Sequence, residues 1–234
     1  MLGPLVGGLI AVAWGFKGLF IIATVLFFIA YIPIIFTKIL PIKYNFVFRE
    51  GLDLYKKYKK YFYSEICNNI GEEVEGVIWP IFVYLSLINI ASVGVVGTLL
   101  AVSSSVFTLI MGRLADKKNK IRLIKTSAIF IMTVWFLRLA FDNESAFYVL
   151  TILSGMVFVI LSVPYYSIFY QIAQKEKAAV FFAFREIPVA IARIIVFSLA
   201  IIFATNLKML FLIAGLVYLY FIFWKNQNNN ELVK

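Results

Sequence analysis

The sequence contains no histidine, and its single cysteine is Cys67. The absence of histidine excludes a Ser-His-Asp triad and the usual zinc centres. One cysteine can form neither an intrachain disulfide nor a thiolate metal site. The sequence also lacks a P-loop and a nucleophile–base pair. We therefore expect a protein that is not an enzyme and that holds no cofactor or metal.

Charge is scarce as well. Charged residues make up 15% of the chain, against 63% hydrophobic and 18% aromatic residues. A water-soluble domain of 234 residues would not tolerate this composition, so we predict an all-α polytopic membrane protein, with the lipid bilayer as its surroundings. The net charge of +10 is also compatible with a nucleic-acid surface. However, apolar runs divide the basic residues into short clusters. This distribution is typical of basic residues that set the topology of a membrane protein, and it argues against a nucleic-acid partner.

A helix needs about 20 apolar residues to cross a bilayer, and this length predicts about seven full spans after one short span. The predicted spans are roughly 1–16, 18–40, 72–90, 91–112, 121–141, 145–171, 179–204 and 207–224. The first span has few residues between Pro4 and Lys17. It is interpreted either as the remainder of an N-terminally incomplete helix or as a re-entrant segment.

If successive spans alternate in direction, most basic residues fall in connections on one side of the membrane. An excess of basic residues identifies that side as cytoplasmic and places the C-terminus there. The predicted divisions are two helices in 1–40, a linker in 41–71, a six-helix bundle in 72–226 and a polar tail in 227–234. The linker mixes aromatic residues with lysines, as an interfacial helix on the inner leaflet does. A regulatory ligand site is the alternative for this linker.

The basic connection between the spans 91–112 and 121–141 carries a motif. It resembles the loop signature of the major facilitator superfamily, in which Gly-x-Leu-Ala-Asp precedes basic residues. The matching residues are Gly112, Leu114, Ala115, Asp116, Lys117 and Lys120. Asn119 stands where the family pattern has a second glycine. We expect a tight turn there, because asparagine tolerates left-handed backbone better than most residues.

A second motif lies at the start, in Gly3, Pro4, Gly7 and Gly8. It is similar to the end of the antiporter motif in the fifth helix of the same superfamily, especially in proton-coupled drug exporters. Glycines spaced by four residues allow close helix packing, and proline allows a bend. The expected partner is the small-residue stripe Gly94, Gly97, Ala101 and Ser105. The alternative is small-residue packing of no particular family.

Together the two motifs set a register. If 1–16 is the fifth helix, the chain resembles helices five to twelve of a twelve-helix transporter, an N-terminally truncated bundle of the major facilitator type in which 1–40 is the remnant of the first half. The resemblance implies a secondary active transporter that exports a small molecule by alternating access, with the proton as coupling ion. The alternative is a transport-inactive remnant, or a membrane half-protein that needs the missing helices or a partner chain. Residue usage rich in Ile, Phe, Lys and Asn is typical of AT-rich microbial genomes, which predicts a prokaryotic plasma membrane.

Charged residues within spans are candidate functional residues, because burying them is costly. Asn68, Glu72, Glu75 and Trp79 share one helical face, just before the helix-weakening Pro80. We predict that Glu75 takes up and releases a proton; interfacial solvation of these carboxylates is the alternative.

Arg193 lies midway along its predicted span and needs an acceptor, for which Glu75 and Glu186 are the candidates. Its role is interpreted as a structural ion pair or as part of an anion-binding or proton-coupling site. Arg138 and Asp142 are spaced as a solvated pair. A lipophilic or cationic ligand would stack on aromatic rings, and the rings chosen for this are Trp79, Tyr165 and Tyr166, with simple packing as the alternative.

Overall fold

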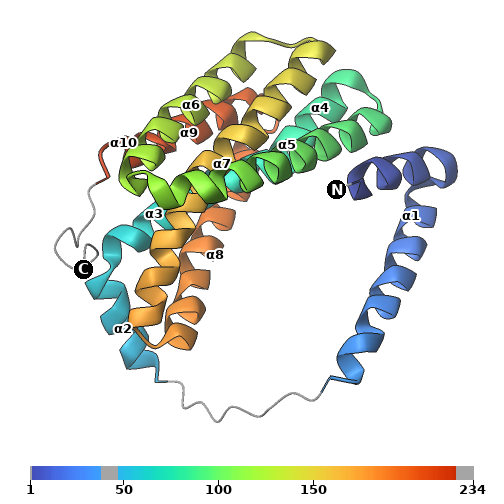
Figure 1. Ribbon diagram of the computed structural model, residues 1–234. Coiled ribbons are helices and arrows are strands. Elements are labelled where there is room, and N and C mark those ends of the chain that lie inside the picture. The colour runs from blue at the N-terminus through green and yellow to red at the C-terminus, as the bar shows by residue number, and fades with distance from the viewer. Residues whose placement is uncertain (1, 38–46, 225–234) are drawn as a thin grey trace.

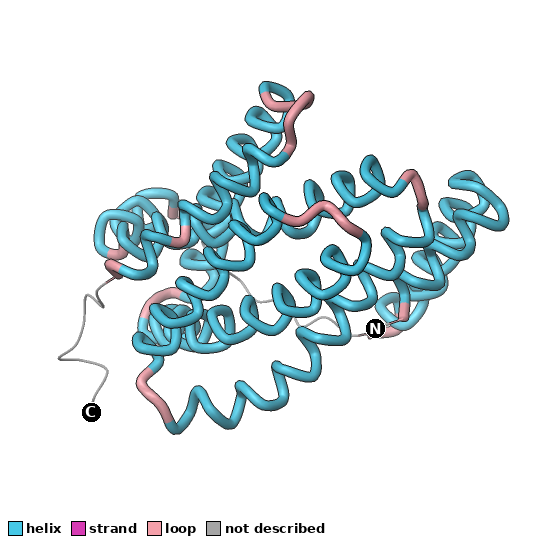
Figure 2. The backbone as a smooth tube through the Cα atoms, turned by 90° about the horizontal axis from the view of Figure 1, so that it is seen from above, coloured by secondary structure: helices cyan, strands magenta, loops and turns pink. Residues whose placement is uncertain are grey.

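The computed structural model describes residues 2–37 and 47–224, and within these ranges the chain is helical without a strand. The elements in chain order are α1 (Gly3–Ile35), α2 (Phe48–Lys57), α3 (Lys59–Glu73), the π-helical turn η1 (Val74–Ile78), α4 (Trp79–Leu87), α5 (Ile90–Lys117), α6 (Lys120–Ala140), α7 (Glu144–Lys175), α8 (Ala178–Ile202), α9 (Lys208–Val217) and α10 (Leu219–Ile222). The predicted all-α class is confirmed for this part of the chain. Figures 1 and 2 show the helices gathered together, and Figure 1 shows the second half of α1 standing to one side.

Four of the described helices, α1, α5, α6 and α7, are long and apolar enough to cross a membrane. They are compatible with an integral membrane protein. The other predicted spans take different forms. The span at 179–204 forms α8, which carries Arg185, Glu186 and Arg193, and the span at 207–224 is divided between α9 and α10.

The helix predicted to start at residue 72 begins further upstream. α3 starts at Lys59 and runs through η1 directly into α4. Tyr61 and Phe62, assigned from the sequence to an interfacial linker, are buried, and α3 packs along α8 (Figure 1). The second half of the predicted linker therefore belongs to the bundle. Residues 38–40 of the predicted span 18–40, residues 41–46 of that linker and the predicted tail at 227–234 lie outside the described residues.

The two spans predicted at 1–16 and 18–40 form a single helix, α1, which is broken near the boundary predicted between them. Gly15 has a φ of 68° and a ψ of 176°, a conformation that glycine adopts without steric cost. The segment before Gly15 packs on α5, and the segment after it points away from the bundle (Figure 1). A Cβ atom on Gly94 would lie 2.9 Å from the carbonyl oxygen of Pro4, and one on Gly8 would lie 3.1 Å from the Cα of Gly94.

The close approach between α1 and α5 therefore uses part of the predicted motif. Gly8 and Pro4 face Gly94 and Gly97. Among the described residues, a Cβ on Gly3 would meet no atom within 4 Å, and one on Gly7 would meet only Leu19, of its own helix, at 3.7 Å. The four-residue spacing of Gly3 and Gly7 is thus not what sets this contact.

Aromatic rings fill the centre of the bundle. Trp79 is fully buried, with Phe147 at 5.4 Å and Phe211 at 5.6 Å between ring centroids. Phe211 in turn stacks on Trp135 of α6 at 5.6 Å. Edge-to-face and stacked contacts of this kind add to the apolar area that the rings remove from solvent. They join α4, α6, α7 and α9 around the first of the polar clusters described below.

Gly155 determines how closely α7 approaches α5. A Cβ at this position would lie 2.1 Å from Ser103 Oγ and 3.0 Å from the carbonyl oxygen of Leu100. Because the backbone oxygen cannot move aside as the hydroxyl can, we expect Gly155→Ala to destabilise the protein by about 1–3 kcal/mol. SDS unfolding from mixed micelles, followed by tryptophan fluorescence, measures this change.

Gly112 provides the control for this prediction. It also lies in a helix, but a Cβ there would meet no described atom within 4 Å. Gly112→Ala should leave stability unchanged or raise it by up to about 1 kcal/mol through helix propensity. Equal stability of the two variants would contradict the packing argument.

Candidate functional site

A buried ion pair joins η1 to α6. Arg138 Nη1 donates to Glu75 Oε2 at 2.6 Å, and Arg138 Nη2 donates to Glu75 Oε1 at 2.9 Å, which is a bidentate geometry. Ser154 of α7 donates to the same Oε2 at 2.7 Å. The Arg138 side chain has no solvent exposure, and that of Glu75 has 6%. We call Glu75, Arg138 and Ser154 the Glu75 cluster.

Two tryptophans enclose the guanidinium of this cluster. The Arg138 Cζ lies 3.9 Å from the ring centroid of Trp79 and 4.5 Å from that of Trp135. Trp79 Nε1 donates to Thr151 Oγ1 at 2.9 Å, which fixes its ring. The aromatic faces replace part of the hydration that the guanidinium loses, and the carboxylate compensates its charge.

Glu75 projects from a widened turn of the helix. Val74–Ile78 forms a π-helical turn, and Pro80, which has no backbone N–H, follows at the start of α4. Such turns weaken the regular hydrogen-bond ladder and occur frequently at functional sites. The helix that carries Glu75 therefore departs from regular α-helical geometry at the residue with the buried charge.

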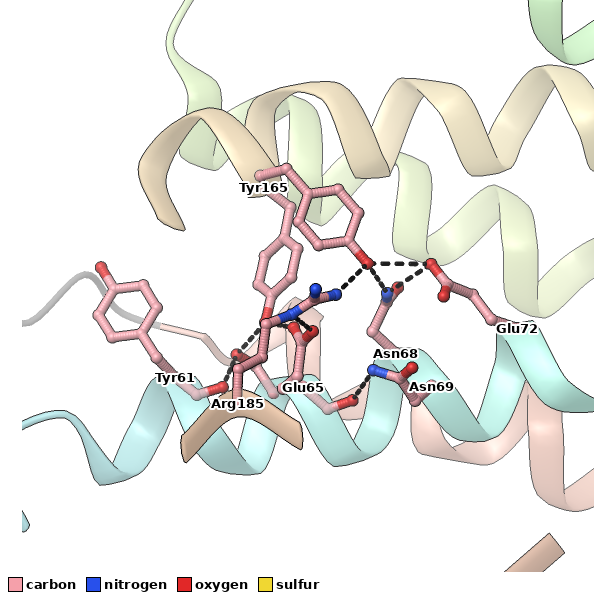
Figure 3. A network of polar contacts seen from close by, with 9 residues as sticks. Tyr61, Glu65, Asn68, Asn69, Glu72, Tyr165 and Arg185 are labelled. Carbon is pink, nitrogen blue, oxygen red and sulfur yellow. Dashed lines mark hydrogen bonds and ion pairs between the residues drawn. The ribbon is translucent and has the colours of Figure 1, made fainter. Parts of the chain in front are cut away.

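A second polar cluster lies one to three turns earlier, where α3 meets α7 and α8. We call it the Glu65 network; its members are Ser64, Glu65, Asn68, Glu72, Tyr165, Tyr166 and Arg185. Glu65 has no solvent exposure, and Figure 3 shows it beside Arg185, with Asn68 and Glu72 further along α3. Arg185 Nε donates to Glu65 Oε1 at 2.5 Å, and the Tyr165 hydroxyl donates to Glu65 Oε2 at 2.8 Å.

Tyr166 connects the two ends of the Glu65 network. Its hydroxyl accepts from Arg185 Nη2 at 3.3 Å and donates to Glu72 Oε1 at 3.3 Å. Asn68 Nδ2 donates to Glu72 Oε1 at 2.8 Å and to the Tyr166 hydroxyl at 3.3 Å. The network thus places two carboxylates and one guanidinium in continuous hydrogen-bond contact.

The pairings of the arginines differ from those predicted. Arg138 was expected in a solvated pair with Asp142, but its side chain turns into the core because Glu75 faces it there. Asp142 instead accepts from Lys208 at 2.5 Å. Arg193 was expected to reach Glu75 or Glu186; its side chain is 57% exposed and donates to Glu73 at 2.6 Å.

The three aromatic candidates for ligand contact divide into two groups. Trp79 and Tyr165 are fully buried, with their polar atoms bonded to Thr151 and Glu65. Neither ring is open to a ligand in this conformation. Tyr166 lies on the wall of a groove of about 710 Å³ between α5 and α7, so it is the one of the three that reaches open space. Glu186 is exposed on α8.

The signature residues lie at the end of α5, not in an extended loop. α5 continues to Lys117, so Gly112, Leu114 and Ala115 are helical, and the Ala115 side chain is buried. Lys120 Nζ donates to Ser167 Oγ of α7 at 2.8 Å. The side chains of Asp116 and Lys117 lie outside what the structure describes.

Asn119 does not adopt the left-handed conformation predicted for it. Its φ is −63° and its ψ is 111°, and its side chain accepts hydrogen bonds from the backbone N–H groups of Ile121 and Arg122. Asn119 is therefore the N-cap of α6, a position that asparagine strongly favours. The side-chain cap, and not a left-handed backbone, allows the chain to turn there.

The turn between α7 and α8 is held to α2 by charged contacts. Glu176 accepts from Lys57 Nζ at 2.7 Å and from the Tyr58 hydroxyl at 2.6 Å. Partial burial alone would raise the pKa of the Glu176 carboxyl, but these two donors outweigh it and the pKa lies below its usual value. Because Lys57 is 61% exposed, the contact orients the turn more than it stabilises the fold.

Glu65 and Arg185 are functional candidates that the sequence reasoning missed. Glu65 precedes Glu72 and Glu75 on the same helical face, at spacings of seven and ten residues. Extending the helix upstream of residue 72 would have revealed it, but the aromatic and lysine content of 41–71 favoured an interfacial linker. The pairing with Arg185 joins α3 to α8 over 120 residues and has no local signal.

Together the fold and the two clusters define an α-helical bundle that is compatible with an integral membrane protein and has compensated charges buried in its interior. No protein-family model matches the chain, and no curated protein matches its sequence.

Proposed function

We propose that the chain is a secondary active transporter of the major facilitator type that exports lipophilic cations in exchange for protons. The observation that carries this proposal is the buried, bidentate Glu75–Arg138 pair at a π-helical turn. A charged pair inside a membrane bundle is costly and marks ion or substrate pathways more often than it adds stability. Its place at a weak point of the α3–η1–α4 helix suits an element that changes shape during alternating access.

Two further features support the proposal. The signature residues Gly112, Leu114 and Ala115 lie at the end of α5, where one apolar helix turns into the next. The Pro4–Gly8 segment packs closely on Gly94 and Gly97 of α5, as expected if α1 starts with the fifth helix of such a transporter. The proposed setting is a prokaryotic plasma membrane with the C-terminus in the cytoplasm.

Ethidium is a suitable probe for this function. We expect liposomes that contain the protein and trapped DNA to accumulate ethidium when a pH gradient is imposed, with fluorescence rising as the dye binds DNA. Empty liposomes and liposomes treated with a protonophore are the controls. Glu75→Gln should lower the initial rate by about tenfold or more, because loss of the carboxylate charge breaks the buried pair on which the proposal rests. Rates are compared at equal amounts of monodisperse, reconstituted protein.

A second candidate is a membrane half-protein that acts only with a partner chain. The observation that favours it is α1, whose large apolar side chains are exposed on several faces, among them Trp14, Phe20, Phe27 and Phe28. A lone helix of this kind suits either lipid or another protein. Absence of gradient-dependent ethidium uptake by well-folded protein would contradict autonomous transport and favour this second candidate.

A further inference from the structure

Glu72 differs from the three carboxylates that flank it on the α3–η1 segment. Each of the other three is paired with an arginine: Glu65 with Arg185, Glu73 with Arg193 and Glu75 with Arg138. Among the described residues, no cation forms an ion pair with Glu72; its Oε1 is held by the neutral groups of Asn68 and Tyr166. Of the four, Glu72 is therefore the carboxylate whose charge no direct partner compensates.

Asn68 suits both protonation states of this carboxylate. It has no solvent exposure, and its Nδ2 donates to Glu72 Oε1 at 2.8 Å, as an ionised carboxylate requires. Its Oδ1 is also buried, and no described group donates a hydrogen bond to it. Rotating the amide by half a turn exchanges the two atoms, so that Oδ1 faces Glu72 and accepts from a protonated carboxyl. The unpartnered acceptor is thus placed beside the acid that can supply its donor.

The charged and titratable groups around Glu72 act in opposite directions. Glu65 on the same helix, with its negative charge, favours a protonated Glu72, and Arg185 of α8 favours an ionised one. Arg185 is bound directly to Glu65, so its charge is already largely compensated. Tyr166 of α7 and the buried Tyr218, which follows α9, complete the surroundings as neutral hydroxyl groups. The balance leaves Glu72 as the group of this network that gains or loses a proton at the smallest cost.

A route to solvent starts at the same tyrosine. Tyr166 lines the groove between α5 and α7, whose wall also carries the polar side chains of Thr108, Ser162, Ser167, Gln171 and Gln174. A groove of about 710 Å³ with such a lining has the room and the polar groups that ordered water needs. Tyr166 lines that groove, and its hydroxyl donates to Glu72 Oε1 at 3.3 Å.

We propose that Glu72 is the exchangeable proton site of this protein, with Asn68 as the amide that adapts to its charge state and Tyr166 as the relay to the groove. In protonation, Asn68 Nδ2 turns away and frees a lone pair of the Tyr166 oxygen. The hydroxyl then passes its proton to Glu72 and takes one from a groove water, and a hydronium ion in the groove restores the proton of that water. One proton is gained overall, and nothing is oxidised or reduced. This inference rests on the proposed proton-coupled function and names the residue that carries the proton, in place of Glu75.

Infrared difference spectroscopy tests the site without any substrate. Spectra of the reconstituted protein are compared between about pH 5 and about pH 8, a range that brackets shifted carboxyl pKa values. We expect a carbonyl band of a protonated carboxylic acid that appears at the lower pH. Glu72→Gln should abolish this band, and the matched variant Glu73→Gln, which removes the neighbouring but arginine-paired carboxylate, should keep it.

Three more variants make the outcome independent of the folding of Glu72→Gln. Glu72→Asp should shift the frequency and midpoint of the band, whereas Glu73→Asp should not. Tyr166→Phe should keep the band but slow its appearance after a pH jump by about tenfold or more. A band that persists unchanged in both Glu72 variants, or that is absent from the parent, would overturn the inference. An intact Glu72 band in a protein that moves no ethidium would instead reject the transport function alone.

Discussion

Arg138→Ala is expected to lower the free energy of unfolding by about 3–5 kcal/mol, the largest effect of any single substitution considered for this chain. The variant leaves the Glu75 carboxylate buried, with the Ser154 hydroxyl as its one remaining hydrogen-bond partner among the described residues. It also removes the guanidinium that lies between Trp79 and Trp135, and with it two cation–π contacts. SDS unfolding from mixed micelles measures the change, with tryptophan fluorescence as the probe.

Arg193→Ala is the matched control for this prediction. Arg193 forms an ion pair with a glutamate at the same distance, 2.6 Å, but its side chain is 57% exposed. Water replaces the lost contact there, so the unfolding midpoint should not change measurably. Comparable losses in the two variants would refute the argument that burial, and not pairing, determines the cost.

The double variant Glu75→Leu with Arg138→Met separates charge compensation from packing. Replacing both partners of a buried pair by apolar residues of similar size is often neutral or stabilising. We therefore expect the double variant to be more stable than Arg138→Ala, and at the same time inactive in ethidium transport. Recovery of both stability and transport would show that the pair is not required for function.

Glu65→Ala is expected to cost about 2–3 kcal/mol, the second largest effect, because Glu65 is fully buried and accepts charge-assisted and hydroxyl hydrogen bonds. The loss is smaller than for Arg138→Ala because the Arg185 side chain is 25% exposed and can turn toward water. Tyr165, which is fully buried, retains Ser64 as its hydrogen-bond partner at 2.9 Å.

Glu50→Ala provides the comparison for Glu65. Glu50 also forms an ion pair across the fold, with Lys177, but its side chain is 35% exposed. Its removal should leave thermal stability nearly unchanged. Glu65→Gln should fall between the two variants, since the amide oxygen still accepts from Tyr165 while the charge is lost. If Glu65→Ala unfolds at the parent's midpoint, the Glu65 network does not hold α3, α7 and α8 together.

The sequence indicated where the carboxylates lie along the helix, but not which of them form ion pairs with arginines. The shared face of Asn68, Glu72, Glu75 and Trp79 follows from helical spacing alone, and η1 and Pro80 interrupt the helix beside Glu75, near where the sequence predicted weakness. The ion-pair partners of these carboxylates could not be derived from helical spacing. Glu75 is 63 residues from Arg138, and Glu73 is 120 residues from Arg193. Solvation was therefore a reasonable prediction for Arg138 and a wrong one.

Composition by itself predicted a helical protein compatible with a membrane, because apolar residues in this proportion leave few soluble alternatives, and the described residues are helical. Local rules also predicted a boundary between two spans near residue 17, where the structure instead has one helix broken at Gly15, and a turn at Asn119. Only the tertiary structure decided the charge pairs, the packing of α3 against α8 and the position of Tyr166, which lines a groove and bonds to Glu72. The physical reason is that a helix presents its side chains at fixed intervals, whereas their partners depend on how distant helices pack. The energies of buried charges depend on those partners.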